Sequence, residues 1–419
     1  MPAGNNGGCV LIKIRQNFPH RRLPDIAAAV RNELNAASLK AGSRVAIGVG
    51  SRGISNIAGI ARAAVDYFTS NGHRPFIFPA MGSHGAGNAE GQASVLAHYG
   101  IDESSMGCPV VSTFDVVSLG RSDAGIEVFA GKDAWESDGV FLINRIKWHT
   151  SFAGGIESGV AKMLAIGLGK LESAKTVHGH ARRLGMDAAI RSVARHLIAT
   201  GKIIGGLGIL EDAYHDTAAV AALPALSLIE REEQLLKTAK SWMARIPVPA
   251  VDLVIVDEIG KNISGTGMDL KIVNRGTAGQ VNPWPEAPRV ERIFVRDLSG
   301  LSYGNAVGIG AADVLHDRLI PKIDVNAGRV NALASGSLGL VKTPLHFASD
   351  RECIDVLAAT VGKFDREDVT IAWIRNTLDL GTIAITENLT SSVSGTDTEF
   401  IGLPFDFEFG ANGNLERFK

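Results

Sequence analysis

Apolar residues along the chain occur in two alternating patterns, and together these patterns predict an α/β protein. Short runs rich in β-branched residues and bounded by turn residues are typical of buried strands, and they include RVAIGVG, PFIFPA, DGVFLINRI and DLVIVDEIG. Between the runs, apolar residues recur every three or four positions, as at Ile26, Val30 and Leu34 and again over residues 228–244. This spacing predicts amphipathic helices, so we expect largely parallel sheets covered by helices.

A proline-bearing stretch, Arg245-Ile-Pro-Val-Pro-Ala250, divides the pattern into two parts. Its prolines end the preceding helix and favour an extended connection. A chain of 419 residues is also long for one domain and natural for two. We therefore predict an N-terminal α/β domain over residues 1–248 and a C-terminal α/β domain over residues 249–419, with the active site in the cleft between them.

The richest candidate chemistry lies between residues 144 and 180. This stretch holds His149, Lys162, His178 and His180 together with the glycine-bearing segments FAGG and IGLGK. A histidine changes charge or binds metal near neutral pH, and a lysine among apolar neighbours can act as a nucleophile. His149 follows a predicted strand, and open α/β sheets bind ligands beyond the carboxyl ends of their strands. A lone histidine or lysine is more often structural or solvated, so it is the occurrence of four such residues in one stretch that favours a functional site.

Two earlier turns have the same placement. Gly50-Ser51-Arg52-Gly53 follows the strand RVAIGVG, and Met81-Gly82-Ser83-His84-Gly85 follows the strand PFIFPA. A strand, a glycine turn and a helix form a unit that favours anions, although many such turns bind nothing. Because His84 and His149 follow different strands, they can converge on one point from opposite sides.

The order His149-x-Ser-Phe-Ala-Gly-Gly, then Lys162-Met-Leu-Ala-Ile-Gly-Leu, then His178 sixteen residues after the lysine resembles the lactate racemase family. The resemblance implies two cofactors, nickel and the nickel-pincer nucleotide (pyridinium-3,5-bisthiocarboxylic acid mononucleotide nickel). It gives Lys162 the covalent bond to this nucleotide. It also makes His178 the nickel ligand, with His180 as the alternative.

The same resemblance implies an isomerase that inverts C2 of a 2-hydroxy acid by reversible hydride transfer. His84 and His149 would be the catalytic acid/base pair, since each enantiomer presents its hydroxyl from a different direction and needs its own proton acceptor. Arg52 and Ser83 would contact the cofactor, and Arg52 would also face the substrate.

A second informative loop, residues 258–269, follows the first predicted strand of the C-terminal domain. It is either a plain glycine-rich connection or a substrate loop in which Lys261, Asn262 and Thr266 bind the acid. Thr266, Gly267 and Met268 do not reproduce the tyrosine, glutamine and lysine of lactate-racemising members. The substrate is therefore expected to be larger than lactate, such as a sugar acid or a hydroxydicarboxylate.

Composition narrows the alternatives. The chain is 45% hydrophobic and 21% charged with a net charge of −2, which gives no footprint for nucleic acid or a membrane surface. Its 3 cysteines are too few and too scattered for a disulfide framework or a cysteine metal site. Without a signal peptide or a long apolar run, a cytoplasmic protein is expected. Its expected partners are a small-molecule substrate and the proteins that make the cofactor, and the sequence leaves its oligomeric state open.

Two other classes remain possible. An NAD(P)-dependent oxidoreductase is disfavoured because GVGSRG after the first strand is a poor substitute for G-x-G-x-x-G. A non-enzymatic, two-lobed ligand-binding protein would not need so many ionisable groups in one stretch. A metal site over Glu211, Asp212, His215 and Asp216 is the weaker reading of that loop, because carboxylate-rich loops are usually solvated.

Overall fold

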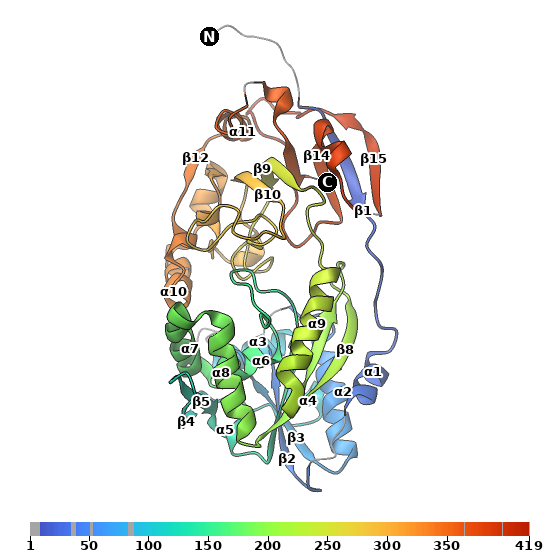
Figure 1. The fold of residues 1–419 in the computed structure, drawn as a ribbon, viewed down its shortest axis with the longest axis vertical. Coiled ribbons are helices and arrows are strands. Elements are labelled where there is room, and N and C mark those ends of the chain that lie inside the picture. The colour runs from blue at the N-terminus through green and yellow to red at the C-terminus, as the bar shows by residue number, and fades with distance from the viewer. Residues whose placement is uncertain are drawn as a thin grey trace. The chain divides into compact units, whose positions relative to one another are not determined.

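The structure, a computed structural model, describes residues 9–34, 39–50, 53–82, 88–363, 365–395 and 397–418. It divides into two compact units. The N-terminal unit is Pro19–Met243, and the C-terminal unit combines the segment ending at Phe18 with Ala244–Lys419. Each has its own sheet with mostly parallel strands, so the predicted α/β class is confirmed (Figure 1).

The N-terminal unit has a five-stranded sheet in the order β3-β2-β6-β7-β8, in which β8 alone is antiparallel to its neighbour. Its strands are β2 (Arg44–Val49), β3 (Arg74–Pro79), β6 (Gly139–Arg145), β7 (Ile203–Glu211) and β8 (Thr217–Pro224), and a separate hairpin joins β4 (Val116–Arg121) to β5 (Glu127–Gly131). Its helices are α1 (Ile26–Glu33), α2 (Ile57–Ser70), α3 (Ala89–His98), α4 (Glu103–Met106), α5 (Lys132–Trp135), α6 (Val160–Lys162), α7 (Lys170–Leu184), α8 (Met186–Ala199) and α9 (Leu228–Trp242).

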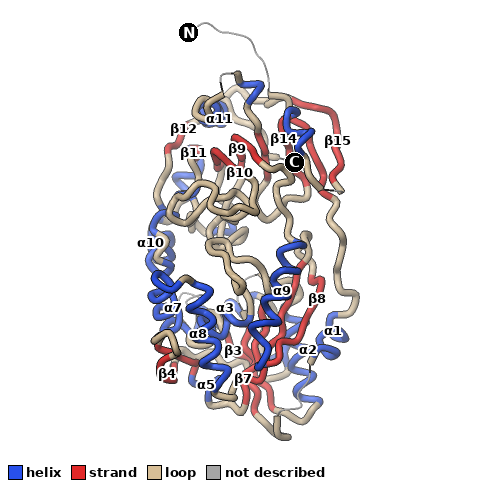
Figure 2. Tube along the Cα trace, viewed as in Figure 1, coloured by secondary structure: helices blue, strands red, loops and turns tan. Residues whose placement is uncertain are grey.

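Helices cover both faces of this sheet because alternate residues of its strands point to opposite sides. In β2, Val45 and Ile47 pack with buried residues of α1 to α4, whereas Ala46 packs with the core of α5 to α9. Figure 2 shows strands of this unit between α8 on one side and α1 and α2 on the other. Strands with two covered faces explain the continuous apolar runs of the sequence.

The C-terminal unit has an eight-stranded sheet in the order β12-β11-β10-β9-β13-β14-β1-β15. Strands β12 to β13 in this order are parallel, and β14, β1 and β15 are antiparallel to their neighbours. The strands are β1 (Leu11–Gln16), β9 (Ala250–Val256), β10 (Arg289–Val295), β11 (Val314–His316), β12 (Leu345–Phe347), β13 (Ile371–Ile374), β14 (Thr382–Thr386) and β15 (Thr398–Phe405), and the helices are α10 (Val325–Ser335) and α11 (Asp350–Ala358).

At its N-terminal end the chain divides into compact units differently from the predicted domains. Strand β1 pairs with β14 on one side and β15 on the other, so residues 11–16 belong to the sheet of the C-terminal unit. Leu11 and Ile14 are fully buried in its sheet. The division of the chain also falls at Ala244, five residues before the predicted start of the second domain.

Residues 305–317 contain a short 3-10 turn and strand β11. Gly308 has a φ of +112°, outside the helical range, and a side chain there would collide with Thr266 O.

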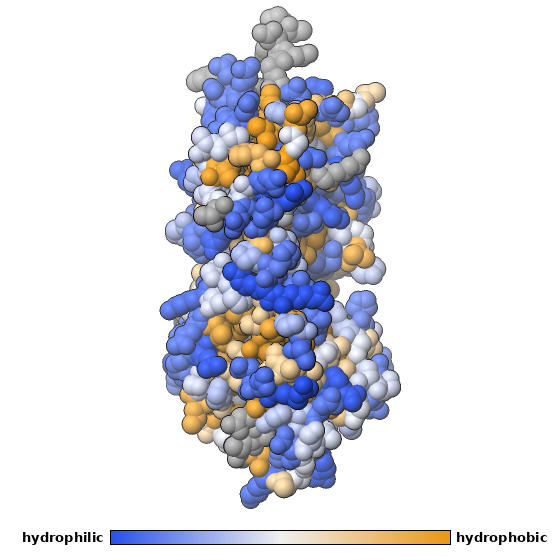
Figure 3. Space-filling view, turned by 90° about the vertical axis from the view of Figure 1, so that its right-hand side faces the viewer, coloured by the Kyte–Doolittle hydropathy of each residue, from blue (hydrophilic) through white to orange (hydrophobic). Residues whose placement is uncertain are grey.

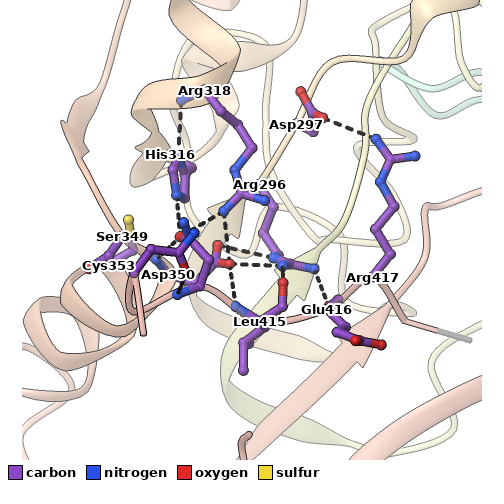
Figure 4. Close-up of polar contacts among 12 residues, drawn as sticks. Arg296, Asp297, His316, Arg318, Ser349, Asp350, Cys353, Leu415, Glu416 and Arg417 are labelled. Carbon is purple, nitrogen blue, oxygen red and sulfur yellow. Dashed lines mark hydrogen bonds and ion pairs between the residues drawn. The ribbon is translucent and has the colours of Figure 1, made fainter. Parts of the chain in front are cut away.

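The C-terminal tail is held by buried charges (Figure 4). Arg296 is 1% exposed and pairs with Asp257 at 2.5 Å and Asp350 at 2.8 Å. Arg296 Nη2 also donates to Leu415 O at 2.7 Å, and Leu415 N donates to Asp350 at 2.9 Å. Although burial opposes it, the Arg296 guanidinium holds the pKa of Asp350 below its usual value. These contacts make the tail part of the unit's core.

Among the described residues, no helix is both long enough and apolar enough to cross a membrane. On the face shown in Figure 3, hydrophilic side chains surround separate hydrophobic groups.

Candidate functional site

The N-terminal sheet has a topological switch point between β2 and β6. The chain runs from β2 outward to β3 on one side and later returns to place β6 on the other side. Ligands of open α/β sheets bind outside the carboxyl ends of such neighbouring strands. Here a methyl group at Gly50, just after β2, would lie 2.8 Å from Asn144 Oδ1 of β6 and 3.0 Å from Met163 Cε. The turn that follows Lys162 therefore packs directly on the switch point.

His149 lies four residues beyond β6, as the sequence predicts, and its ring is half-buried. Nδ1 of the ring accepts a hydrogen bond from Ser151 N at 3.2 Å and lies 3.0 Å from Ser151 Oγ. The ring stacks on Phe152 with 4.3 Å between the centroids. The backbone amide of His149 donates to Glu157 Oε2 at 2.6 Å, so both ring and backbone are held.

Lys162 ends the short helix α6, and a π-helical turn, Met163–Gly167, follows at once. Single π-helical turns occur frequently at functional sites. The lysine is half-buried, and its Nζ lies 5.6 Å from the centre of the Phe152 ring. Phe152 thus contacts both His149 and Lys162, and the structure brings these two predicted site residues together around one aromatic ring.

His178 and His180 both lie on α7, and both are half-buried. A helix turns about 100° per residue, so side chains two positions apart point in nearly opposite directions. Only one of the two histidines can therefore face a given site. His180 Nδ1 lies 2.9 Å from Thr176 O, a contact of the kind that orients metal-bound histidines. Among the described residues, no group of three or more His, Cys, Asp or Glu side chains gathers as a metal site.

Three predicted site residues, Arg52, Ser83 and His84, lie outside the described residues. The residues that precede them, Gly50 and Gly82, are described. Gly50 precedes Arg52 and lies against Met163, while a methyl group at Gly82 would lie 3.2 Å from Ile166. Both turns therefore start from points in contact with the π-helical turn after Lys162.

The glycines of the FAGG segment, Gly154 and Gly155, lie close to charged side chains of α8. A methyl group at Gly154 would lie 2.8 Å from Asp187, and one at Gly155 would lie 2.6 Å from Arg191. Asp187 Oδ1 accepts from Ile156 N at 2.7 Å. These glycines serve the packing of α8 against the loop.

Sequence reasoning missed a buried lysine at the start of α7. Lys170 is 3% exposed, and its Nζ donates to Pro79 O at the end of β3 and to Gln92 Oε1. Gln92 in turn donates to Gly82 O at 3.0 Å. Burial lowers the pKa of Lys170 to about 8, against the attraction of Asp133. The sequence indicates this lysine only by its place after an apolar run, at the end of the glycine-bearing segment IGLGK.

The C-terminal sheet has its own switch point, between β9 and β13. The predicted substrate loop, residues 258–269, starts there, and Asp269 N donates to Thr377 Oγ1 after β13 at 2.8 Å. Lys261 is half-buried and its Nζ donates to Gly265 O at 2.6 Å, while Asn262 is exposed.

The residues that depart from lactate-racemising members point mostly inward. The Thr266 hydroxyl donates to Met268 O at 2.7 Å, and Met268 is fully buried. A methyl group at Gly267 would collide with Val307 O, so the loop packs tightly on its own unit. Lys261 and Asn262 are consequently the side chains of this loop best placed to meet a ligand.

The acidic loop after β7 is structural. Asp212 accepts hydrogen bonds from the backbone amides of Arg21, Tyr214 and Asp216. Glu211 pairs with Arg145 and accepts from Ser55 N at 2.8 Å. These contacts use the carboxylates to fix turns, and Glu211 and Asp212 are buried rather than solvated as expected.

The chain matches no protein-family model and no curated protein. Among solved structures it is similar to a structural-genomics protein from Thermotoga maritima, with 12% identity and a TM-score of 0.49 over 85% of this chain and 97% of that one. It is also similar to the lactate racemase apoprotein from Thermoanaerobacterium thermosaccharolyticum, with 14% identity and a TM-score of 0.48 over 93% and 96% of the two chains. Likenesses of this strength assign no function.

Proposed function

We propose that this protein is a racemase or epimerase that inverts C2 of a 2-hydroxy acid with a nickel-pincer nucleotide bound covalently to Lys162. The observation that carries the proposal is the contact of Phe152 with both His149 and Lys162 beside the switch point of the N-terminal sheet. A group for covalent attachment thereby lies close to a group for proton transfer, where α/β sheets bind ligands.

The side chains present suit this cofactor. Lys162 is half-buried, and its amine lies over the aromatic ring of Phe152. The helix that follows carries two imidazoles, and a neutral imidazole is a good nickel ligand. The spacing of sixteen residues from Lys162 favours His178 as the nickel ligand, whereas the contact with Thr176 favours His180. Substitution of each histidine in turn decides between them.

When bound, the cofactor supplies a pyridinium ring that accepts hydride from C2 and returns it. The chain's own residues handle the proton. Nδ1 of His149 is held by Ser151, so we assign proton exchange with the C2 hydroxyl to Nε2. In this proposal His84 exchanges the proton with the C2 hydroxyl of the other enantiomer, and Arg52 binds the carboxylate of the substrate.

The proposed substrate is longer than lactate. Lys261 and Asn262 offer donors for an additional hydroxyl or a second carboxylate. A site built to bind such groups discriminates strongly against analogues that lack them, since its polar groups are then left unpaired. Lys261→Met is expected to raise KM for the long acid more than for lactate.

The test uses enzyme produced in a host that makes the cofactor. Deuterium exchange at C2 is measured for lactate, malate, tartrate and a panel of sugar acids. We expect exchange with at least one longer acid and slower exchange with lactate. Lactate reacting faster than every longer acid would contradict the substrate proposal. No exchange with any acid, together with NAD reduction, would favour the oxidoreductase, and neither activity would favour a ligand-binding protein.

A further inference from the structure

Two charged side chains of helix α9, Lys240 and Glu232, contact residues 149–162, the segment that contains both His149 and Lys162. Near the C-terminus of α9, Lys240 Nζ lies 2.5 Å from Glu157 Oε1. Glu157 is fully buried, and its other oxygen accepts the His149 amide at 2.6 Å. The lysine charge therefore stabilises the buried carboxylate that fixes the backbone of His149.

Near the N-terminus of α9, Glu232 contacts the turn of Lys162. Its Oε2 accepts a hydrogen bond from Ala161 N at 2.9 Å. Its Oε1 is buried and has no hydrogen-bond partner among the residues that the structure describes. A methyl group at Gly159 would lie 2.2 Å from that oxygen, so the glycine is needed for the carboxyl group to reach the turn.

Packing of the helix alone does not explain why a glutamate stands at position 232. Leu228 and Leu236, four positions before and after it, are buried on the same stripe of the helix. A leucine at position 232 would continue that stripe, whereas a buried carboxyl group with an unpaired oxygen is costly. Such a group in a folded protein calls for a specific role.

We propose that α9 positions both site residues: Lys240 holds His149 through Glu157, and Glu232 holds the turn that presents Lys162. The two arms act on different amides, so each can be removed separately. The meaning of this positioning for catalysis rests on the proposed function, but the positioning itself can be measured in the full chain without cofactor.

The experiment is residue-resolved hydrogen exchange on the full-length apoprotein. Lys240→Met should accelerate exchange of the His149 amide about tenfold or more and leave the Ala161 amide unchanged, because one charge-assisted contact is lost. Glu232→Leu should do the reverse. Lys240→Arg and Glu232→Gln, which keep a donor and an acceptor, should restore most of the protection. Lys237→Met and Glu230→Leu, exposed positions of the same helix, are the matched controls.

Equal acceleration of both amides in either variant, or acceleration in the controls, would overturn the proposal in favour of general loosening. Unchanged exchange would overturn it as well. If Glu232→Leu does not fold, exchange in Lys240→Met and in Glu232→Gln still tests the proposal by the same criteria. In the holoenzyme, Lys240→Met should lower kcat at unchanged adduct content. An unchanged kcat with this exchange pattern would contradict the role of the positioning in catalysis, whereas a wild-type holoenzyme without activity would contradict the proposed function and leave the positioning intact.

Discussion

Replacing Glu232 by glutamine should change how the stability of the protein depends on pH. Glu232 is fully buried, and burial raises its pKa from 4.5 to about 7, against the attraction of the Ala161 and Val160 amides and of Arg191. Arg191 approaches from α8 and the two amides from α6, while Glu233 on α9 itself pairs with Arg191. Burial therefore dominates over every group that favours the charged form.

The sign and size follow from proton linkage. Because the carboxyl group binds its proton more tightly in the folded state, its protonated form favours folding fully below pH 4.5. This contribution is lost as pH rises through about 7. Each pKa unit corresponds to about 1.4 kcal/mol, so ionisation of Glu232 should reduce the free energy of unfolding by about 3 kcal/mol between pH 4.5 and pH 8.

The Glu232→Gln variant lacks this titration. It adds a buried amide that is poorly paired, which costs about 1–3 kcal/mol at every pH. The difference in free energy of unfolding, variant minus wild type, should therefore be negative at pH 5 and rise by about 2.5 kcal/mol by pH 8.

The assay is urea unfolding at pH 5, 6, 7 and 8, with extrapolation to zero denaturant. Other titrating groups are common to both proteins and cancel in the difference. Glu230→Gln, an exposed position on the same helix, should show a difference that does not vary with pH. A constant difference for Glu232→Gln would refute the argument that burial controls this carboxyl group.

Other substitutions test separate parts of the account. Lys170→Met should remove a rise in stability between pH 8 and pH 10.5, because burial lowers the pKa of Lys170 to about 8 and its neutral form favours folding; exposed Lys175→Met should keep that rise in urea unfolding. Asp350→Asn should destabilise the C-terminal unit by about 1.5–3 kcal/mol in the same assay, since it removes the charge of Asp350 from its pair with Arg296, which keeps Asp257; unchanged stability would contradict this. In holoenzyme, His178→Ala should lose nickel by elemental analysis while keeping the Lys162 adduct, and retained nickel would move the ligand to His180.

The parts of the fold that could be predicted from sequence are those specified locally. Continuous apolar runs between glycine turns predicted β2, β3, β6 and β9, and the position of His149 followed from the end of β6. Strand β1 could not be assigned to its sheet in this way, because its neighbours β14 and β15 lie more than 360 residues away in sequence.

The groups that support the candidate site were missed for a related reason. Glu232 lies in the charged string IEREEQ, which resembles a solvated helix face. Its spacing of four from Leu228 and Leu236 was the available signal, since it places the carboxyl group on the buried stripe. The contact partner, the Ala161 amide, lies 71 residues earlier and no local pattern indicates it.

The most direct test of the central claim is the mass of the Lys162 peptide in active enzyme. The protein is produced with the proteins that make the cofactor, its activity is verified, and it is digested and mapped by mass spectrometry. The account predicts a covalent adduct on the peptide that contains Lys162, together with nickel close to one equivalent per chain. An unmodified Lys162 in enzyme that inverts a 2-hydroxy acid would contradict it.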